Sequence, residues 1–141
     1  HLKPLPKGGH FKPIKLLKTA VFPGFATDLQ APFSVLLTQA NGNSRIFETL
    51  FEGRLNYLFE LERLGAHIQM QDTQQATITG PTRLKGASIT SCDIRAGAAV
   101  VLASLIAEGT THIHDISYID RGYERLDETL RHLGAIIERA D

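Results

Sequence analysis

The sequence predicts an α/β fold built from about two copies of one helix-and-strand unit, and three observations lead there. The stretch from Ser91 to Gly109 has no charged residue between Arg95 and Glu108, which is typical of a helix buried on all sides. A second stretch, beginning at Asp28, has a similar sequence. The landmarks that follow the two stretches also correspond, so a repeated unit organises the chain.

The central helix is predicted from its two ends. Asp93 is a good N-cap and Gly109 is a good residue for the position after the last turn. The run is well short of the roughly 20 residues that cross a bilayer, so a buried core helix is expected. Arg95, in the first turn, adds a cation to a helix end that is already partly positive. We therefore expect an anion to bind there.

The repeat places corresponding residues in two copies, at about residues 28–80 and 93–141 of a single 141-residue domain. Each copy is expected to contain a buried helix, a strand, a turn that carries an arginine, an amphipathic helix and a further strand. Asp28-Leu-Gln-Ala-Pro-Phe-Ser-Val-Leu-Leu aligns with Asp93-Ile-Arg-Ala-Gly-Ala-Ala-Val-Val-Leu. The later pairs are Gly42 with Gly109, Arg54 with Arg121, and Leu64-Gly65-Ala66 with Leu133-Gly134-Ala135.

The other elements follow from periodicity and from turn residues. Phe11 to Ala20 could hold a strand, and Pro13 restricts that strand to an edge. The segment 22–27 is rich in turn residues and leads into a helix that starts at Asp28 and ends at Asn41-Gly42. Strands are expected at 44–48, 67–71, 76–80, 110–115 and 135–138, and helices at 54–64 and 121–133.

Composition and charge set the class of protein. The formal net charge is zero, but residues 1–27 hold five lysines and no acidic residue. Since no aromatic platform accompanies these lysines, we expect a solvated basic segment rather than a nucleic-acid interface. No signal peptide or membrane span is evident, so a cytoplasmic protein with no membrane partner is expected. The chain starts at His1 without a methionine, which suggests a fragment.

Asp28 and Asp93 have the same place in the two copies, and N-capping explains a carboxylate at either position. Arg54 and Arg121 are both expected where a loop meets a helix start. An arginine there does not complement the helix dipole, so an anion or a nearby carboxylate is the expected partner. For Arg121 an ordinary ion pair with Asp120 or Glu124 is the alternative to an anion site.

Two further groups have simple structural explanations. His112 and His114 share one strand face, but no third ligand lies at metal-binding spacing, so no metal site is expected. No histidine lies at a sequence spacing from Cys92 that would indicate a catalytic Cys–His pair, so Cys92 is expected to be a structural thiol. Neither a Walker loop nor a Gly-x-Gly-x-x-Gly motif is present.

Four motifs, in order, resemble those of one enzyme family. They are Phe22-Pro-Gly-Phe-Ala-Thr-Asp28-Leu-Gln, Glu48-Thr-Leu-Phe-Glu-Gly-Arg54, Asp93-Ile-Arg-Ala-Gly-Ala-Ala and Tyr118-Ile-Asp-Arg121-Gly-Tyr-Glu-Arg125. Together with the closing Leu133-Gly-Ala-Ile-Ile-Glu-Arg139, they resemble the C-terminal part of the UDP-N-acetylglucosamine 1-carboxyvinyltransferases, which are enolpyruvyl transferases. The resemblance runs from about Phe11 to Asp141.

The resemblance implies an inside-out α/β barrel made of repeated βαβαββ units, of which this chain is an incomplete domain. It implies transfer of the enolpyruvyl group of phosphoenolpyruvate to the 3′-hydroxyl of UDP-N-acetylglucosamine, the first committed step of peptidoglycan synthesis, without a cofactor. The missing N-terminal domain of the same enzyme would be a partner. Because that domain carries the family's Lys-Asn pair and its Cys-bearing loop, the fragment alone is expected to be inactive.

By position in these motifs, Asp28 resembles the carboxylate that contacts the sugar hydroxyl and deprotonates it. Leu50 lies where the family binds the sugar nucleotide, and Arg95 and Arg121 resemble the arginines that meet phosphoenolpyruvate. Asp93 and Arg54 are possible supporting residues. Two alternatives stay open: the shikimate-pathway enolpyruvyl transferase (3-phosphoshikimate 1-carboxyvinyltransferase), which shares fold and chemistry, and a non-catalytic half-barrel that only binds.

Overall fold

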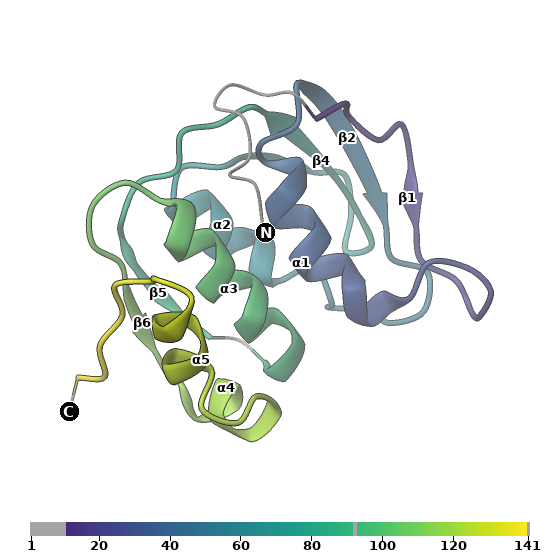
Figure 1. Cartoon of the computed structure of the whole chain (residues 1–141). Helices are drawn as coiled ribbons and strands as arrows, with labels where there is room; N and C mark the ends of the chain where they lie inside the picture. The colour runs from purple at the N-terminus through teal and green to yellow at the C-terminus, as the bar shows by residue number, and fades with distance from the viewer. Residues whose placement is uncertain (1–10, 92, 141) are drawn as a thin grey trace.

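The structure is a computed structural model that describes residues 11–91 and 93–140. Helices α1 (Thr27–Leu37) and α3 (Ile94–Ile106) pack side by side at its centre (Figure 1). A four-stranded sheet lies beyond α1, and a two-stranded sheet lies on the side of α3 (Figure 1). The α/β class predicted from the sequence is therefore the observed one, with two helices packed side by side between the sheets.

The four-stranded sheet has the order β1-β2-β4-β3. Its strands are β1 (Leu17–Lys18), β2 (Gly42–Phe47), β3 (His67–Met70) and β4 (Gln75–Gly80). β1 pairs with β2 in parallel and lies at the edge, as Pro13 predicted, while the other pairs are antiparallel. Side chains alternate along β2 and beyond it, so that Ser44, Ile46 and Glu48 are all buried on one side. A carboxylate thus occupies a position where the strand pattern predicts an apolar residue.

Helix α2 (Tyr57–Arg63) and the turn before it supply much of the core. Leucines recur at positions 55, 58, 61 and 64, and all four are fully buried. This spacing places them on one face of the helical segment, which packs against α3 and the neighbouring strands. Arg54 lies in the turn, next to the first of these leucines. Burial of Leu55 therefore fixes the backbone from which the arginine side chain extends.

Helix α3 follows the uncharged stretch, but its burial differs from the prediction. Ala96, Ala99, Val100 and Ala103 are buried, whereas Leu102, Leu105 and Ile106 are partly exposed. Helices α1, α2 and α4 cover one side of α3, so the apolar helix is enclosed on part of its circumference only. The helix also ends earlier than predicted. Ala107 is the C-cap in an extended conformation, and Gly109 (φ +89°) turns the chain two residues later.

The C-terminal region differs most from the prediction. In place of one helix over 121–133 there are two short helices, α4 (Ser117–Gly122) and α5 (Leu126–His132). The break occurs because Tyr123 is extended and Arg125 is left-handed. The strand expected at 135–138 is absent: this segment has no neighbouring strand to pair with, and Ile136 is 99% exposed.

The second sheet contains β5 (Ser88–Thr90) and β6 (His112–His114), which pair in parallel. The sequence had indicated a strand at 110–115 but only a lead-in to the central helix at 88–91. Helix α3 is joined to β5 and to β6 by short segments, and α2 packs against β5, so this sheet lies on the side of the molecule away from the large sheet (Figure 1). Among the residues described, no helix is both long and apolar enough to span a bilayer.

Candidate active site

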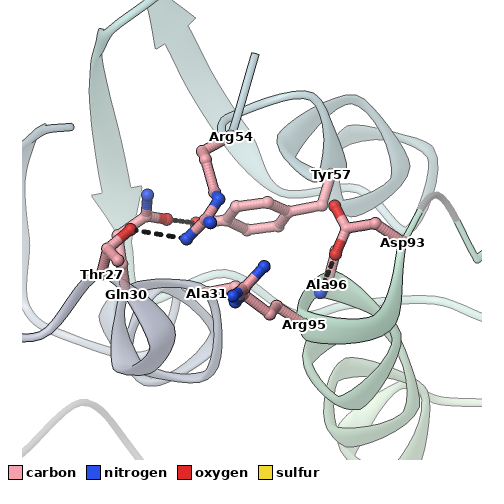
Figure 2. A pocket seen from close by; sticks show the side chains of 8 residues that line it. All are labelled: Thr27, Gln30, Ala31, Arg54, Tyr57, Asp93, Arg95 and Ala96. Atoms are coloured by element: carbon pink, nitrogen blue, oxygen red, sulfur yellow. Dashed lines mark hydrogen bonds between the residues drawn. The ribbon is translucent and has the colours of Figure 1, made fainter. Parts of the chain in front are cut away.

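The N-terminal ends of α1 and α3 face one small hollow, shown in Figure 2. Its walls come from α1, from the turn before α2 and from the start of α3. The lining residues are Thr27, Gln30, Ala31, Arg54, Tyr57, Asp93, Arg95 and Ala96. The hollow has room for about one water molecule. Two helix N-termini and two guanidinium groups therefore meet at one point, which makes the region attractive to anions.

Asp28 lies at the edge of this hollow and pairs with two arginines. Its Oδ1 accepts a hydrogen bond from Arg95 Nε and lies 3.6 Å from Arg54 Nη1. The expectation that Asp28 is an N-cap is wrong, because α1 begins at Thr27 and Ala26 occupies the cap position without a side-chain hydrogen bond. Asp28 is thus a first-turn residue whose carboxylate is 63% exposed and free of the helix N–H groups.

Asp93, at the start of α3, behaves as predicted. Its backbone is extended, and its Oδ1 accepts a hydrogen bond from the Ala96 N–H at 2.7 Å. One of the free N–H groups of the helix is satisfied in this way. Asp93 also lines the hollow, so the same side chain caps α3 and forms part of the wall. Figure 2 shows this cap on the side of the hollow opposite Thr27.

Arg54 is held on several sides. Its Nη1 donates a hydrogen bond to Thr27 Oγ1 at 2.9 Å, and its guanidinium carbon lies 4.0 Å from the centre of the Phe51 ring. The side chain is 16% exposed, compared with 52% for Arg95. Stacking and hydrogen bonding together fix the direction of a guanidinium group. Arg54 is therefore a fixed cation beside Asp28, while Arg95 reaches Asp28 from a more open position.

Arg121 lies in the last turn of α4, so the prediction that it begins a helix is wrong. It is exposed, and within 11–91 and 93–140 its side chain forms no hydrogen bond or ion pair. The alternative, an ion pair with Asp120 or Glu124, is not formed among the described residues either; Asp120 binds Arg139 instead, at 2.7 and 3.1 Å. The next residue, Gly122, packs so closely on Ile94 that a Cβ would lie 2.3 Å from it.

This contact places the end of α4 against the start of α3, one residue from Arg95. Arg121 does not line the hollow itself. The structure thus brings Asp28, Arg54, Asp93 and Arg95 together, and it leaves Arg121 nearby as a cation without a partner among the described residues.

Leu50 lies in the loop after β2, and its backbone is fixed by Glu48. The Leu50 N–H donates to Glu48 Oε1 at 3.0 Å, and the Phe51 N–H donates to the same oxygen at 3.3 Å. Leu50 is 37% exposed, so this constrained loop presents it at the surface. The glutamate that holds this loop is fully buried.

Glu48 is the main residue that the sequence analysis missed. Its other donors are the hydroxyl groups of Thr19 and Thr27 and the amide of Gln30. Burial on its own raises the pKa of this carboxyl group, but the surrounding hydrogen bonds together hold the pKa below its ordinary value. The sequence does contain a signal for Glu48. It follows Ser44 and Ile46 at every second position, on the side of the strand that is buried, and a charged group buried there needs several hydrogen-bond partners.

Gln30 and Tyr57 were missed as well. Tyr57 is buried, and its hydroxyl group donates to Gln30 Oε1 and lies 2.6 Å from Ser34 Oγ. Burial raises the pKa of the Tyr57 hydroxyl group, so it stays protonated. These hydrogen bonds could not be predicted from the sequence, because Gln30, Ser34 and Tyr57 share no motif and come together only after folding.

The histidines do not join this site. His112 and His114 are exposed on β6, and His114 Nε2 lies 2.7 Å from Ser88 Oγ. In the part of the chain that the structure describes, no group of three or more His, Cys, Asp or Glu residues could hold a metal ion. Cys92, expected to be a structural thiol, lies outside the described residues.

The chain is similar to known proteins in sequence and in structure. The family model of EPSP synthase (3-phosphoshikimate 1-carboxyvinyltransferase) matches residues 5–130. A UDP-N-acetylglucosamine 1-carboxyvinyltransferase of Wolinella succinogenes is 54% identical over 121 residues, which is 86% of this chain and 28% of the relative. One of Chlorobium phaeovibrioides is 46% identical over 139 residues, which is 99% of this chain and 32% of the relative.

Solved structures agree. The enolpyruvyl transferase NikO from Streptomyces tendae is 32% identical with a TM-score of 0.79, over 90% of this chain and 30% of that one. EPSP synthase from Acinetobacter baumannii has a TM-score of 0.65, over 91% of this chain and 28% of that one; at 18% identity, this shows the fold alone.

The chain therefore spans about a third or less of the length of these proteins. The enolpyruvyl transferase fold expected from the four motifs is confirmed, and so is the resemblance to the UDP-N-acetylglucosamine 1-carboxyvinyltransferases. The chain belongs to the EPSP synthase family of enolpyruvyl transferases.

Proposed function

We propose that this chain is the C-terminal part of a UDP-N-acetylglucosamine 1-carboxyvinyltransferase. The complete enzyme transfers the enolpyruvyl group of phosphoenolpyruvate to the 3′-hydroxyl of UDP-N-acetylglucosamine and releases phosphate. The observation that carries the proposal is the carboxylate of Asp28, which does not cap its helix and is held instead between Arg54 and Arg95 at an exposed edge. The two relatives described above support the choice of substrate.

In this proposal Asp28 is the general base for the sugar hydroxyl group. A carboxylate that is exposed and oriented by a fixed cation can accept a proton from a hydroxyl group placed within hydrogen-bond distance. Arg54 orients it from the inner side. Arg95 pairs with Asp28 from the outer side in the absence of substrate and turns toward phosphoenolpyruvate when that anion is present.

Arg95 and Arg121 bind phosphoenolpyruvate in this proposal. A guanidinium group stays charged and binds a carboxylate or a phosphate through two parallel hydrogen bonds. Arg121 has no competing partner among the described residues, and the packing of Gly122 on Ile94 keeps the end of α4 close to the start of α3. The backbone at Leu50 binds the sugar nucleotide, and Asp93 supports the wall of the site.

The remaining groups come from the rest of the enzyme, and the site is completed when its two domains close over the substrates. The enzyme acts in the cytoplasm at the first committed step of peptidoglycan synthesis, without a metal or cofactor. Since this chain spans 28–32% of its relatives, we expect the 141-residue chain by itself to be inactive. Phosphate release by the purified 141-residue protein above the buffer rate would refute that expectation.

One alternative has an observation of its own: the matching family model is described as 3-phosphoshikimate 1-carboxyvinyltransferase. The deciding experiment measures phosphate release by the complete protein with phosphoenolpyruvate and either UDP-N-acetylglucosamine or shikimate 3-phosphate. We expect saturable turnover with the sugar nucleotide only. Turnover with shikimate 3-phosphate alone would support the alternative, and binding without turnover would support a non-catalytic domain.

A further inference from the structure

Glu48 is a buried charge whose two oxygens serve two different parts of the molecule. Oε1 accepts from the Thr19 hydroxyl group at 3.0 Å and from the backbone N–H groups of Leu50 and Phe51. Oε2 accepts from the Thr27 hydroxyl group at 2.8 Å and from Gln30 Nε2 at 3.0 Å. One oxygen therefore holds the loop after β2, and the other holds the first turn of α1.

Stability alone is a poor reason for this arrangement. A buried carboxylate loses its hydration, and well-packed apolar residues stabilise a core as well or better. What the carboxylate supplies is a fixed relation between its donors, because hydrogen bonds to a charged acceptor are stronger than those to a neutral one and all five donors converge on one group. Here the donors belong to the residue that follows β1, to α1 and to the 49–51 loop, three segments that are distant in sequence.

A second step leads from Glu48 to Asp28. Thr27 donates to Glu48 Oε2 and accepts a hydrogen bond from Arg54 Nη1 at 2.9 Å. Arg54 Nη1 in turn lies 3.6 Å from Asp28 Oδ1. Since Ala26 supplies no cap to α1, Glu48 is the acceptor that fixes the Thr27 side chain at the start of this helix.

We infer that Glu48 is a positioning residue for the enolpyruvyl transfer proposed above. Its carboxylate acts through Thr27 and Arg54 to fix the position of Asp28 relative to the loop that carries Leu50. The inference rests on the proposed function. It assigns Glu48 no contact with substrate. The carboxylate sets the distance between the group that accepts the sugar proton and the backbone that binds the sugar nucleotide.

The first test is Glu48→Gln in the complete protein. The N–H groups of Leu50 and Phe51 can only donate, so the amide oxygen faces them and the amide NH₂ faces Thr27 and Gln30. The loop side keeps its acceptor while the α1 side loses it. We expect kcat to fall about ten- to a hundredfold, as small misplacements of catalytic groups do, with KM for UDP-N-acetylglucosamine nearly unchanged.

The matched control is Glu60→Gln. Glu60 is also buried, and its Oε2 accepts from the Thr90 N–H at 2.9 Å, away from the hollow. The same chemical change there is expected to lower the thermal midpoint and to leave kcat unchanged. This comparison separates two effects: a change in the position of Asp28 relative to the Leu50 loop, and the loss of stability that follows from altering any buried carboxylate.

A second pair of variants keeps Glu48 intact, in case Glu48→Gln does not fold. Thr27→Val has nearly the same shape but lacks the hydroxyl group that joins Glu48 to Arg54, whereas Thr27→Ser retains it. We expect kcat to fall in Thr27→Val and to recover most of its value in Thr27→Ser. A role in packing alone would give the opposite order, because Ser loses the methyl group.

Wild-type kcat and KM in both Glu48→Gln and Thr27→Val, with only lower thermal midpoints, would overturn the inference and leave the proposed function standing. Absence of transfer to UDP-N-acetylglucosamine by the wild-type complete protein would overturn the proposed function and this inference with it. A kcat loss in Glu48→Gln no larger than in Glu60→Gln would also contradict the inference.

Discussion

The starts of α1 and α3 carry aspartates at matching places in the sequence, yet the two carboxylates do different things. Asp93 binds the N–H of its own helix, at Ala96. Asp28 binds arginines from outside its helix, Arg54 and Arg95. The cause is a shift of the helix boundary: α3 starts one residue after its aspartate, and α1 starts one residue before its own. A shift of two residues thus turns a cap into a carboxylate that pairs with arginines outside its helix.

The two helix starts also differ in what holds them. α3 has a side-chain cap of its own, in which Asp93 accepts a hydrogen bond from the Ala96 N–H. α1 has Ala26 at the cap position, and its first turn is fixed from the strand side by Glu48. The two helix starts show that a first-turn carboxylate that does not bind its own helix N–H groups is available to partners outside the helix.

The largest expected effect is that of Asp28→Asn in the complete protein. Asn cannot accept the hydroxyl proton, and a positioned general base contributes about a hundred- to ten-thousandfold. We expect kcat to fall by at least about two orders of magnitude with a nearly unchanged thermal midpoint. Asp93→Asn should cost less, since Asn is an equally good cap, although Asp93 lines the hollow and need not be silent. Equal, mild losses at both positions would contradict a catalytic role of Asp28.

Next in size is the effect of Arg121→Lys, which probes an arginine without a partner among the described residues. Lysine keeps the charge but lacks the two-pronged hydrogen bonding of guanidinium. We expect kcat/KM for phosphoenolpyruvate to fall at least about tenfold while the thermal midpoint is unchanged. Arg139→Lys, in which the substituted arginine binds Asp120 and Asp127, is the control. Unchanged kinetics in Arg121→Lys would show that the residue is a surface cation only.

A smaller expected effect is the pH dependence of the free energy of unfolding that Glu48 contributes at the start of α1. The pKa of Glu48 is lowered in the folded protein from its ordinary value of 4.5. Its contribution to the free energy of unfolding is therefore present above that value and is lost as the pH falls through the folded pKa. Denaturant unfolding should show a difference between wild type and Glu48→Gln that shrinks as the solution is acidified below pH 4.5. A difference that grows on acidification would mean that the pKa of Glu48 is raised.

The sequence predicted features that depend on residues close together in the chain, and it did not predict features that depend on tertiary packing. The cap at Asp93 was predictable, because the cap and its acceptor lie three residues apart. The cluster of Asp28 and Arg95 followed from the family resemblance only. The positions of Asp28 in its first turn and of Arg121 in a last turn were not predictable, because helix boundaries depend on tertiary packing.

Longer-range causes explain the remaining differences. Gly122 is pressed against Ile94, and the left-handed Arg125 follows it, so the pattern that predicted one helix over 121–133 is interrupted by a tertiary contact. The segment 135–138 has apolar residues suited to a strand but no strand beside it. Glu48 was missed for a similar reason, since its five donors come from segments up to 29 residues away.

The most direct test of the account compares the thermal midpoints of Asp28→Ala and Asp93→Ala in the complete protein. The midpoints are measured in about 1 M salt, because salt weakens ion pairs between exposed side chains such as Asp28 and Arg95. Loss of a cap costs about 1 kcal/mol and persists in salt, whereas exposed ion pairs contribute between about 0 and 1 kcal/mol and weaken. We predict a lower midpoint for Asp93→Ala and a wild-type midpoint for Asp28→Ala. Equal losses, or a larger loss at Asp28, would contradict the claim that only Asp93 is a cap.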